Sequence, residues 1–333
     1  MVRVNVFAEN GDWVFEDLKQ HFARAQVAGL EVLASAEPLA GADVWVSISP
    51  SQAINSPDLA RTVVCIHDLY EHSGIYSPEG DRRAVRRAGA LVLSHPLQRR
   101  ILTEAGVSLE GVPTHEGPLG ALSIFTARSE ATPCFSVGWV GRHDAQGRKR
   151  CEWFVEAING LDPAPGRLRT VLVGCGLDGH AERLRAGGVT CLHYARESHP
   201  IAEYPRFYRQ MDCLVITSST EAGPLPLFEA LATGLPVIST PVGWAPHFAA
   251  EHPRYVRLAE SPAEITDHLR RLGGEREQLF REREEIASLV RDYRLEGWLR
   301  DVLRLAGSLH ARPRAGEDKL RTGASPGSPL DAA

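Results

Sequence analysis

The stretch SSTEAGPLPLFEALATGLP, Ser218 to Pro236, lies between two short apolar, β-branched runs. CLVIT precedes it and PVIST follows it, and runs of this length and composition are typical of buried strands. Pro224 and Pro226 cannot lie inside a helix, but proline is favoured in the first turn, and glycine commonly ends a helix. The stretch therefore predicts a strand, a loop, a helix that begins near Leu225 or Pro226 and ends at Gly234, and a second strand.

The two glutamates of this stretch are predicted to face one ligand from different elements. Glu221 falls in the loop, and Glu229 falls within the first turn or so of the helix. The free backbone N–H groups of Gly223 and Leu225 lie at a helix N-terminus and at the carboxyl end of a strand, which suits a phosphate group. The alternative is a capped core helix in which Glu229 only complements the helix dipole.

The order of the predicted elements divides the chain into two α/β domains. Predicted strands alternate with helices in the first third of the chain and again from Phe135 onward, a pattern that is typical of parallel sheets. A segment rich in proline, glycine, serine and threonine predicts a linker near residues 120–133. We predict an N-terminal domain at 1–125, a C-terminal domain at 134–290, a helix at 291–308 and a disordered tail at 311–333.

The last part of the second half is predicted to be helical. Separate helical runs are expected over residues 261–272 and from Glu275 onward. The final helix carries an apolar stripe at i, i+3, i+4 and i+7 spacing, so we expect it to pack against another element. The stripe consists of Leu295, Trp298, Leu299, Val302 and Ala306.

The composition argues against several classes of partner. The 333 residues carry a formal net charge of -5, and no basic helix or patch suggests nucleic acid or a membrane surface. No apolar run has the length of a membrane span, and the first residues, MVRVNVFAEN, alternate like a strand rather than a secretion signal. The six cysteines are scattered without a C-x-x-C pair, which predicts reduced thiols. We expect a cytoplasmic protein.

Arg142 and Lys149 are candidates for binding phosphate. They follow FSVGWVG, the first predicted strand of the second domain, and ligands of open α/β sheets bind at the carboxyl ends of strands. A lysine ammonium, a point charge with rotatable donors, suits a phosphate oxygen, and the neighbouring Arg148 could also take this role. The alternative is a solvated basic loop.

The first domain contributes two candidate positions. His67 ends the strand-like run TVVCIH, where the neighbouring Asp68 could fix its tautomer. The alternative for His67 is a structural histidine at a strand end. Gly11 lies in the first predicted strand-to-helix turn and resembles part of an anion or acceptor loop.

A glycine pattern and several absences bear on cofactors. Gly174, Gly176 and Gly179 form G-x-G-x-x-G after a predicted strand, but any strand-to-helix turn favours glycine, so a dinucleotide site is not favoured. We expect this turn to approach the base or ribose of a nucleotide. The sequence has no H-E-x-x-H, G-x-x-x-x-G-K-[ST] or D-x-D motif, and phosphate chemistry here is expected to need no metal or cofactor.

Taken together, these residues resemble the retaining glycosyltransferases of family 4, which have the GT-B fold. Glu221 and Glu229, followed by ALATGLPVISTPVG, match the E-x7-E motif of that family, and VGWVGR followed by RK matches its second motif. IHD is common in the first domain of such enzymes. The resemblance extends to about Gly307 and implies two Rossmann-like domains facing across a cleft, with the last helix crossing back to the first domain.

The resemblance also implies roles for individual residues. Glu229 would bind the ribose hydroxyls of the donor, Glu221 the sugar hydroxyls near the reacting carbon, and Arg142 with Lys149 the diphosphate. His67 would face the donor sugar and the acceptor. The catalytic set so implied is His67, Glu221, Arg142 and Lys149, and the donor-binding set is Gly11, Arg142, Lys149, Gly174, Glu221, Ala222, Gly223, Leu225 and Glu229.

The implied function is metal-independent transfer, with retention, of a sugar from a nucleotide sugar to a small-molecule acceptor. A UDP-sugar is the expected donor, and natural-product or antibiotic biosynthesis is the expected setting. Two alternatives share the same architecture, namely a sugar-nucleotide 2-epimerase and an inactive protein that only binds a nucleotide sugar. No nucleic acid and no membrane insertion are expected.

Overall fold

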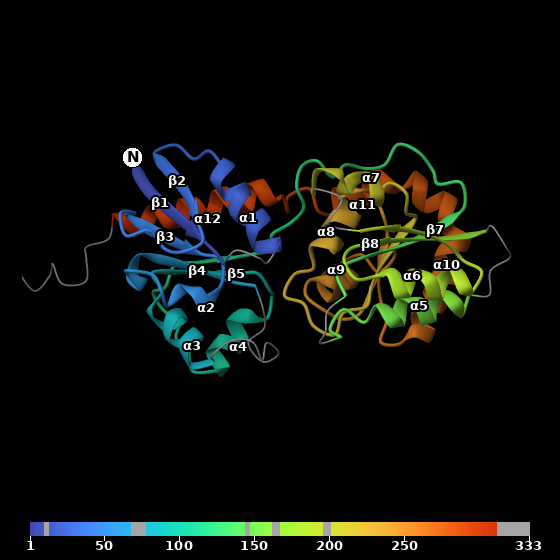
Figure 1. Ribbon diagram of the computed structural model, residues 1–333, viewed down its shortest axis with the longest axis horizontal. Helices are drawn as coiled ribbons and strands as arrows, with labels where there is room; N and C mark the ends of the chain where they lie inside the picture. The colour runs from blue at the N-terminus through green and yellow to red at the C-terminus, as the bar shows by residue number, and fades with distance from the viewer. Residues whose placement is uncertain (10–12, 68–77, 144–146, 162–166, 196–200, 312–333) are drawn as a thin grey trace, which may run out of the picture.

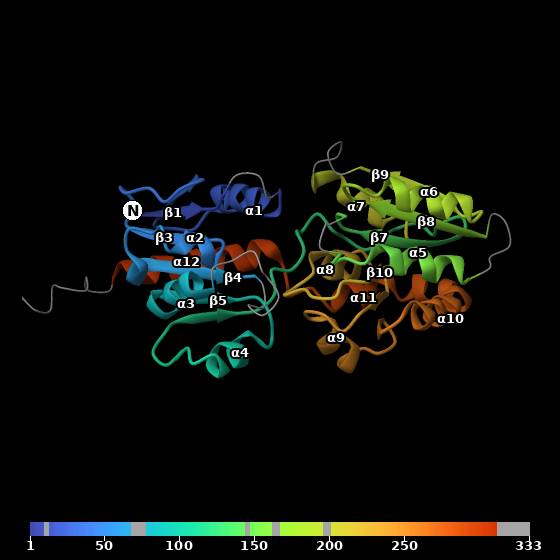
Figure 2. The same cartoon turned by 60° about the horizontal axis from the view of Figure 1, so that its bottom comes forward.

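A computed structural model of the protein describes residues 1–9, 13–67, 78–143, 147–161, 167–195 and 201–311. The chain forms two α/β domains that lie next to each other along the long axis of the molecule (Figures 1 and 2). Each domain is built on a parallel six-stranded sheet. The predicted fold class, two Rossmann-like domains, is confirmed.

The first sheet has the strand order β2-β1-β3-β4-β5-β6. Its central strands are apolar at successive positions because helices cover both faces. In β4, Val63 and Cys65 face a core with α1 and α12, while Val64 and Ile66 face a core with α2, α3 and α4. The elements are β1 (Val2–Phe7), α1 (Trp13–Arg24), β2 (Leu30–Ser35), β3 (Val44–Ser47), α2 (Pro50–Ala53), β4 (Thr62–Ile66), α3 (Pro78–Arg87), β5 (Ala90–Leu93), α4 (Gln98–Glu104) and β6 (Thr114–Glu116).

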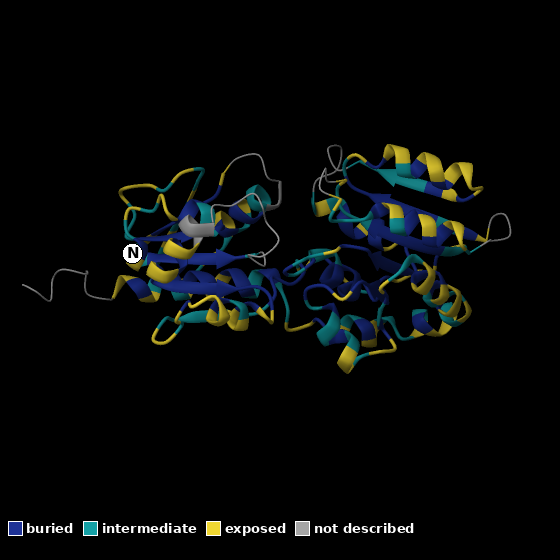
Figure 3. Cartoon of the chain, turned by 90° about the horizontal axis from the view of Figure 1, so that it is seen from below, coloured by how far each residue is buried: buried dark blue, intermediate teal, exposed yellow. Residues whose placement is uncertain are grey.

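The second sheet has the strand order β12-β11-β10-β7-β8-β9, so the chain leaves β7 in one direction and β10 in the other. The elements are β7 (Phe135–Val140), α5 (Cys151–Asn159), β8 (Leu168–Val173), α6 (Asp178–Ala186), β9 (Thr190–Tyr194), α7 (Tyr204–Tyr208), β10 (Cys213–Ile216), α8 (Leu225–Ala232), β11 (Val237–Ser239), α9 (Ala245–Glu251), β12 (Val256–Leu258), α10 (Pro262–Arg281) and α11 (Arg283–Ser288). Buried residues follow the strands of both sheets, whereas helix surfaces carry the exposed positions (Figure 3).

The stretch from Ser218 to Pro236 forms the predicted elements. β10 is followed by a loop, α8 begins at Leu225, and Gly234 ends it with φ +78°. A Cβ atom at position 234 would lie 2.6 Å from the carbonyl oxygen of Arg283, so both the backbone angle and the space require glycine. Further on, α10 runs continuously through Gly273 and Gly274, where the sequence predicted separate helices.

The chain passes between the domains twice, and the two passages are hydrogen-bonded to each other. Ala121 N donates to Tyr293 O at 3.2 Å, and Leu295 N donates to Ala121 O at 3.0 Å. A Cβ atom at Gly120 would lie 2.2 Å from Tyr293 O. The segment after β6 and the segment before α12 therefore form one paired connection.

The last helix, α12 (Leu295–His310), lies against the first sheet although it follows the second domain in sequence (Figure 1). All five residues of the predicted apolar stripe are buried in the core that contains β1, β3 and β4. The predicted helix at 291–308 begins later and ends later than expected, because residues 291–294 form the connection. The predicted tail at 311–333 lies almost wholly outside the described residues. No helix in the described part has the length and apolarity to cross a membrane.

We expect Leu303→Ala to destabilise the first domain although Leu303 lies near the end of the chain. Leu303 is fully buried against the first sheet, and removal of such a side chain costs about 2–5 kcal/mol. Hydrogen exchange of the β1 and β3 amides, with urea unfolding, measures the loss. Arg300→Ala, at an exposed position of the same helix, should change stability by less than about 0.5 kcal/mol. Faster exchange in the second sheet alone would contradict this packing.

Candidate functional site

A cavity lies between the two domains at the carboxyl ends of their strands. Its second-domain wall comes from the loops after β7 and β10, the two neighbouring strands from which the chain departs in opposite directions. Ligands of open α/β sheets bind at such a switch point. The first-domain wall includes His67, directly after β4, and Ser94, directly after β5.

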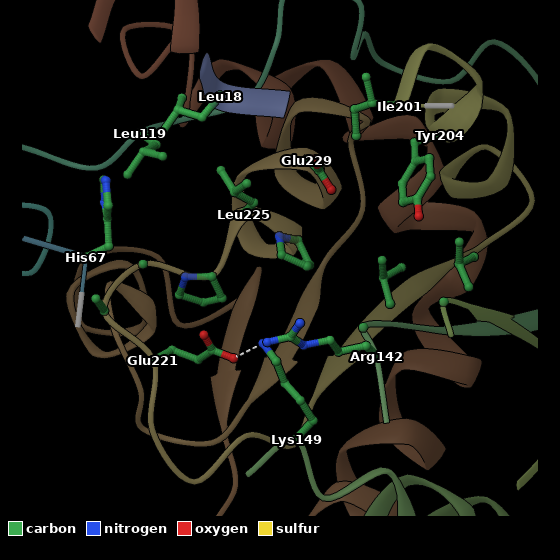
Figure 4. A pocket seen from close by; sticks show the side chains of 18 of the residues that line it. Leu18, His67, Leu119, Arg142, Lys149, Ile201, Tyr204, Glu221, Leu225 and Glu229 are labelled. Atoms are coloured by element: carbon green, nitrogen blue, oxygen red, sulfur yellow. Dashed lines mark hydrogen bonds and ion pairs between the residues drawn. The ribbon is translucent and has the colours of Figure 1, made fainter. Parts of the chain in front are cut away.

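The labelled side chains around this cavity fall into three groups (Figure 4). Arg142, Lys149 and Glu221 gather on one side. Ile201, Tyr204 and Glu229 lie on another side, and His67, Leu18 and Leu119 lie together on the side of the first domain. Leu225 lies between the groups. The cavity thus has two polar regions from the second domain and a mainly apolar region from the first.

Glu221 and Lys149 are direct partners. The Lys149 ammonium forms an ion pair with Glu221 Oε1, and Ser218 Oγ donates to the same oxygen at 2.8 Å. Both side chains remain partly accessible to the cavity. This contact ties the loop after β7 to the loop after β10, and none of the described residues is hydrogen-bonded to the second oxygen of Glu221.

Arg150 fixes the position of this ion pair. It has φ +45°, the only positive φ of a non-glycine residue in the described part of the chain, and such conformations are uncommon and concentrate at functional sites. Its Nε donates to Thr217 O and its Nη2 to Ser218 O, each at 2.8 Å. Thr217 Oγ1 donates back to Lys149 O at 2.6 Å. Arg150 therefore holds Lys149 against the loop that carries Glu221.

Glu229 lies in the second turn of α8 and is held by a buried tyrosine. The Tyr208 hydroxyl donates to Glu229 Oε2 at 2.5 Å. Burial, reinforced by the nearby Glu229, raises the pKa of Tyr208 well above its ordinary value, so the hydroxyl stays protonated and remains a donor. One carboxylate oxygen is thus fixed while the side chain still lines the cavity.

The loop after β11 contacts the first domain beside Gly223, which lies between the two glutamates. Trp244 Nε1 donates to Ser94 O at 2.8 Å, across the two domains. A Cβ atom at Gly223 would lie 3.4 Å from the same Ser94 oxygen and 3.6 Å from Trp244 Cδ1. Ala222, Gly223 and Leu225 all line the cavity, so the start of α8 is presented to it.

His67 is the ionisable group among the described residues of the first-domain wall. Its Nδ1 lies 3.1 Å from Ser94 Oγ, and its buried Nε2 has no hydrogen-bond partner among the described residues. The ring packs between Phe15 and Trp298, with centroid distances of 5.9 and 6.0 Å. Burial lowers the pKa of His67 to about 4, so the imidazole is neutral near pH 7. A neutral ring with one free nitrogen suits a hydroxyl ligand.

The glycine pattern after β8 serves close packing. Gly174 has φ +146°, and a Cβ atom there would lie 1.5 Å from Gly141 O. Only glycine lets the ends of β7 and β8 approach this closely. Gly174 lines the cavity, and its expected approach to the base or ribose of a nucleotide stays a prediction.

The structure brings nearly all the sequence-predicted site residues to one cavity. Arg142, Arg148, Lys149 and His67 line it together with both glutamates and Gly174. Gly11 and Asp68 lie outside the described residues. Among the described residues, no group of three His, Cys, Asp or Glu side chains is arranged to hold a metal ion.

Sequence reasoning missed several residues that shape the cavity. They are Phe15, Leu18, Ser94, Leu119, Ile201, Tyr204, Tyr208 and Trp244, together with the role of Arg150. Most of them belong to ordinary apolar patterns of helices and strands, so no local signal distinguishes them. The charged run RKR drew attention to the residues around Lys149, but it did not predict the backbone conformation of Arg150.

We expect acid to destabilise the first domain through His67. The pKa of His67 is about 4 when folded and 6.5 when exposed, so the unfolded chain takes up the proton first as the pH falls. Stability from the neutral ring is present above pH 6.5 and is lost between about pH 6.5 and pH 4. The loss between about pH 7 and pH 5 is about 2 kcal/mol, measurable by urea unfolding. His67→Gln should reduce this dependence of the unfolding free energy on pH, and His310→Gln, at an exposed site, should not.

The second domain matches a protein-family model. Residues 134–274 match the family described as "Glycosyl transferases group 1", and this segment holds Arg142, Lys149, Glu221 and Glu229. No curated protein has significant sequence similarity to the chain.

Solved structures with a similar fold cover almost the whole chain. HepE from Anabaena, in complex with UDP, aligns with a TM-score of 0.67 at 14% identity over 92% of this chain and 100% of its own. Sucrose-phosphate synthase from Thermosynechococcus elongatus aligns with a TM-score of 0.69 at 15% identity over 93% and 100%. The lipopolysaccharide outer core galactosyltransferase WaaB aligns with a TM-score of 0.62 at 14% identity over 92% and 99%. The chain therefore has the GT-B fold, and its second domain matches the group 1 glycosyl transferases.

Proposed function

We propose that the protein is a retaining, metal-independent glycosyltransferase that moves a sugar from a UDP-sugar to a small-molecule acceptor. The observation that carries the proposal is the convergence of Glu221, Glu229, Arg142 and Lys149 on one cavity at the switch point of the second sheet. Cations, carboxylates and a helix N-terminus are the groups needed by a donor made of a diphosphate and hydroxyl-rich rings. HepE, which shares the fold, was solved with UDP and with UDP-glucose, and this favours UDP as the nucleotide.

In the proposed donor complex, the two glutamates bind neutral parts of the donor. Glu229, held by Tyr208, accepts hydrogen bonds from the ribose hydroxyls, and Glu221 accepts them from the sugar. Arg142 and Lys149 meet the diphosphate together with the N–H groups at the start of α8. The ion pair between Lys149 and Glu221 places the cation for the leaving group beside the carboxylate for the sugar.

The proposed reaction develops negative charge on the departing diphosphate. Donors that are already oriented toward such charge stabilise a transition state without further reorganisation. Arg150 holds Lys149 in place before the donor arrives, through its hydrogen bonds to the loop after β10. On the opposite wall, neutral His67 lines the cavity on the side where sugar and acceptor are proposed to meet. Its buried Nε2, which has no partner among the described residues, is the atom that would bond a hydroxyl group there. A small natural product, as in antibiotic biosynthesis, is the acceptor that we favour.

A transfer assay tests the proposed function. Thermal shift against UDP-, GDP- and ADP-sugars selects the donor, and incubation with an alcohol acceptor should then give UDP and a glycoside with the anomeric configuration of the donor, as read by NMR. Because the cations belong to the protein, the rate should be unchanged in EDTA. A strict need for magnesium or manganese would refute the metal-free assignment. Conversion of the donor sugar without any acceptor would indicate an epimerase instead.

We expect Lys149→Ala and Glu229→Gln to have different kinetic signatures. Loss of the Lys149 charge should lower kcat about thirty-fold to a thousand-fold, because this charge acts on the leaving group. Glu229 acts on hydroxyls whose charge does not change, so Glu229→Gln should raise the donor KM and the Kd of free UDP, with a smaller change in kcat.

Controls separate these effects from neighbouring ones. Because Lys149 pairs with Glu221, the Lys149→Ala/Glu221→Gln double variant measures how much of the loss belongs to the pair. Glu182→Gln, at an exposed position of α6, should leave both constants unchanged. If Glu229→Gln binds UDP as tightly as the parent protein, calorimetry would show that Glu229 does not hold the ribose.

A further inference from the structure

The first-domain wall of the cavity is largely apolar. Phe15 and Leu18 come from α1, and Leu119 comes from the segment after β6. Leu225, at the start of α8, packs against the same apolar core. Figure 4 shows Leu18 and Leu119 at one end of the cavity, near His67 and away from Arg142 and Lys149, with Leu225 between the two regions. An apolar surface therefore lies opposite the cations.

This surface is part of the hydrophobic core of the first domain. Leu18 and Leu119 are 4% and 8% exposed and belong to the core that includes α12. Phe15 is half-buried, and the centroid of its ring lies 5.9 Å from that of the His67 ring. Because these side chains are held by the sheet beneath them, the surface keeps its apolar character whether or not a ligand is present.

Among the residues that the structure describes, the first domain offers this surface no cation. Its described lining residues are Phe15, Leu18, His67, Ser94 and Leu119, and His67 is neutral near pH 7. The first domain has a single lysine, Lys19, whose ammonium pairs with Glu16 at 2.7 Å and lies 3.3 Å from Ala8 O.

The absence of cations determines which acceptor fits. A phosphate or carboxylate placed against this wall would lose its hydration and gain no partner of opposite charge, which is unfavourable. An apolar ring or chain would instead remove its own surface and that of the leucines from water, which is favourable. The cations of the cavity, Arg142, Arg148 and Lys149, all belong to the second domain, where the proposed donor diphosphate lies.

We propose that the acceptor is an uncharged alcohol or phenol whose reacting hydroxyl adjoins an apolar ring or chain bound against Phe15, Leu18, Leu119 and Leu225. The assignment rests on the proposed function. In the transfer, the acceptor oxygen forms a bond to the anomeric carbon and the bond from that carbon to the diphosphate breaks. The bonding pair leaves with UDP, which takes up the hydroxyl proton. Acceptors that carry phosphate are disfavoured, because the described first-domain residues of the cavity supply no positive charge.

A binding experiment tests the surface independently of catalysis. With the protein saturated in UDP, saturation-transfer NMR compares 2-naphthol, glucose and fructose 6-phosphate. The expected result is binding of 2-naphthol with weaker or no binding of the two sugars. Equal or stronger binding of fructose 6-phosphate, or no binding of 2-naphthol, would overturn the assignment.

Two variants locate the binding to this wall. Phe15→Arg should raise the Kd of 2-naphthol about ten-fold, which is the effect of losing one large apolar contact. The same variant should lower the Kd of fructose 6-phosphate, because it adds a positive charge. Phe15→Ala should also raise the Kd of 2-naphthol, but it should not improve the binding of fructose 6-phosphate. Leu39→Arg adds the same charge at an exposed position of the same domain and should change neither. An unchanged Kd for UDP shows that each variant is folded, and equal 2-naphthol affinity in Phe15→Arg and Leu39→Arg would refute the placement.

Transfer from UDP-glucose separates this inference from the proposed function. Efficient transfer to 2-naphthol with little to fructose 6-phosphate supports both. Transfer to fructose 6-phosphate in preference would uphold a glycosyltransferase and overturn the apolar acceptor. Binding of 2-naphthol at this wall without transfer from any nucleotide sugar would uphold the surface and remove the proposed activity.

Discussion

Backbone hydrogen bonds between Ala121 and the segment Tyr293–Leu295 join the two passages of the chain between its sheets. The carboxyl edges of the two sheets can form one cavity only if these passages hold the domains in this arrangement. Gly120 is required here, because a side chain would collide with the Tyr293 carbonyl group. The contact between Trp244 and Ser94 adds a second link, within the cavity itself. The return of α12 to the first core anchors the far end of the connection.

This arrangement divides the chemistry between the domains. The second domain supplies the charged groups, and these are linked to one another through Lys149, Glu221 and the hydrogen bonds of Arg150. The first domain supplies a neutral histidine and an apolar surface from its own core. A nucleotide sugar and an uncharged acceptor are complementary to the two walls, so the division of charge accounts for the proposed selectivity.

The sequence predicted the strands and helices that have a clear pattern of apolar residues and missed those in which this pattern is weak. β4 and β10 are buried on both faces and read as continuous apolar runs. β2, β6 and β12 lie at the edges of their sheets and have mostly half-buried or exposed residues, so none of them has the continuous apolar run that marks a buried strand. α3 was missed because its sequence, PEGDRRAVRR, is rich in arginine and short of apolar residues.

What the sequence alone determined is the local structure of the site: a helix that begins near Leu225 or Pro226 and ends at Gly234, and two glutamates on a loop and a helix after a buried strand. These follow from rules that act over a few residues, such as the fixed φ of proline and the freedom of glycine. Only the tertiary structure decided that Lys149 pairs with Glu221, that Tyr208 orients Glu229, and that Phe15, Leu18 and Leu119 form the opposite wall. These residues are far apart in the chain and are brought together by the order of parallel strands and the pairing of the two passages between the domains, which no local pattern encodes.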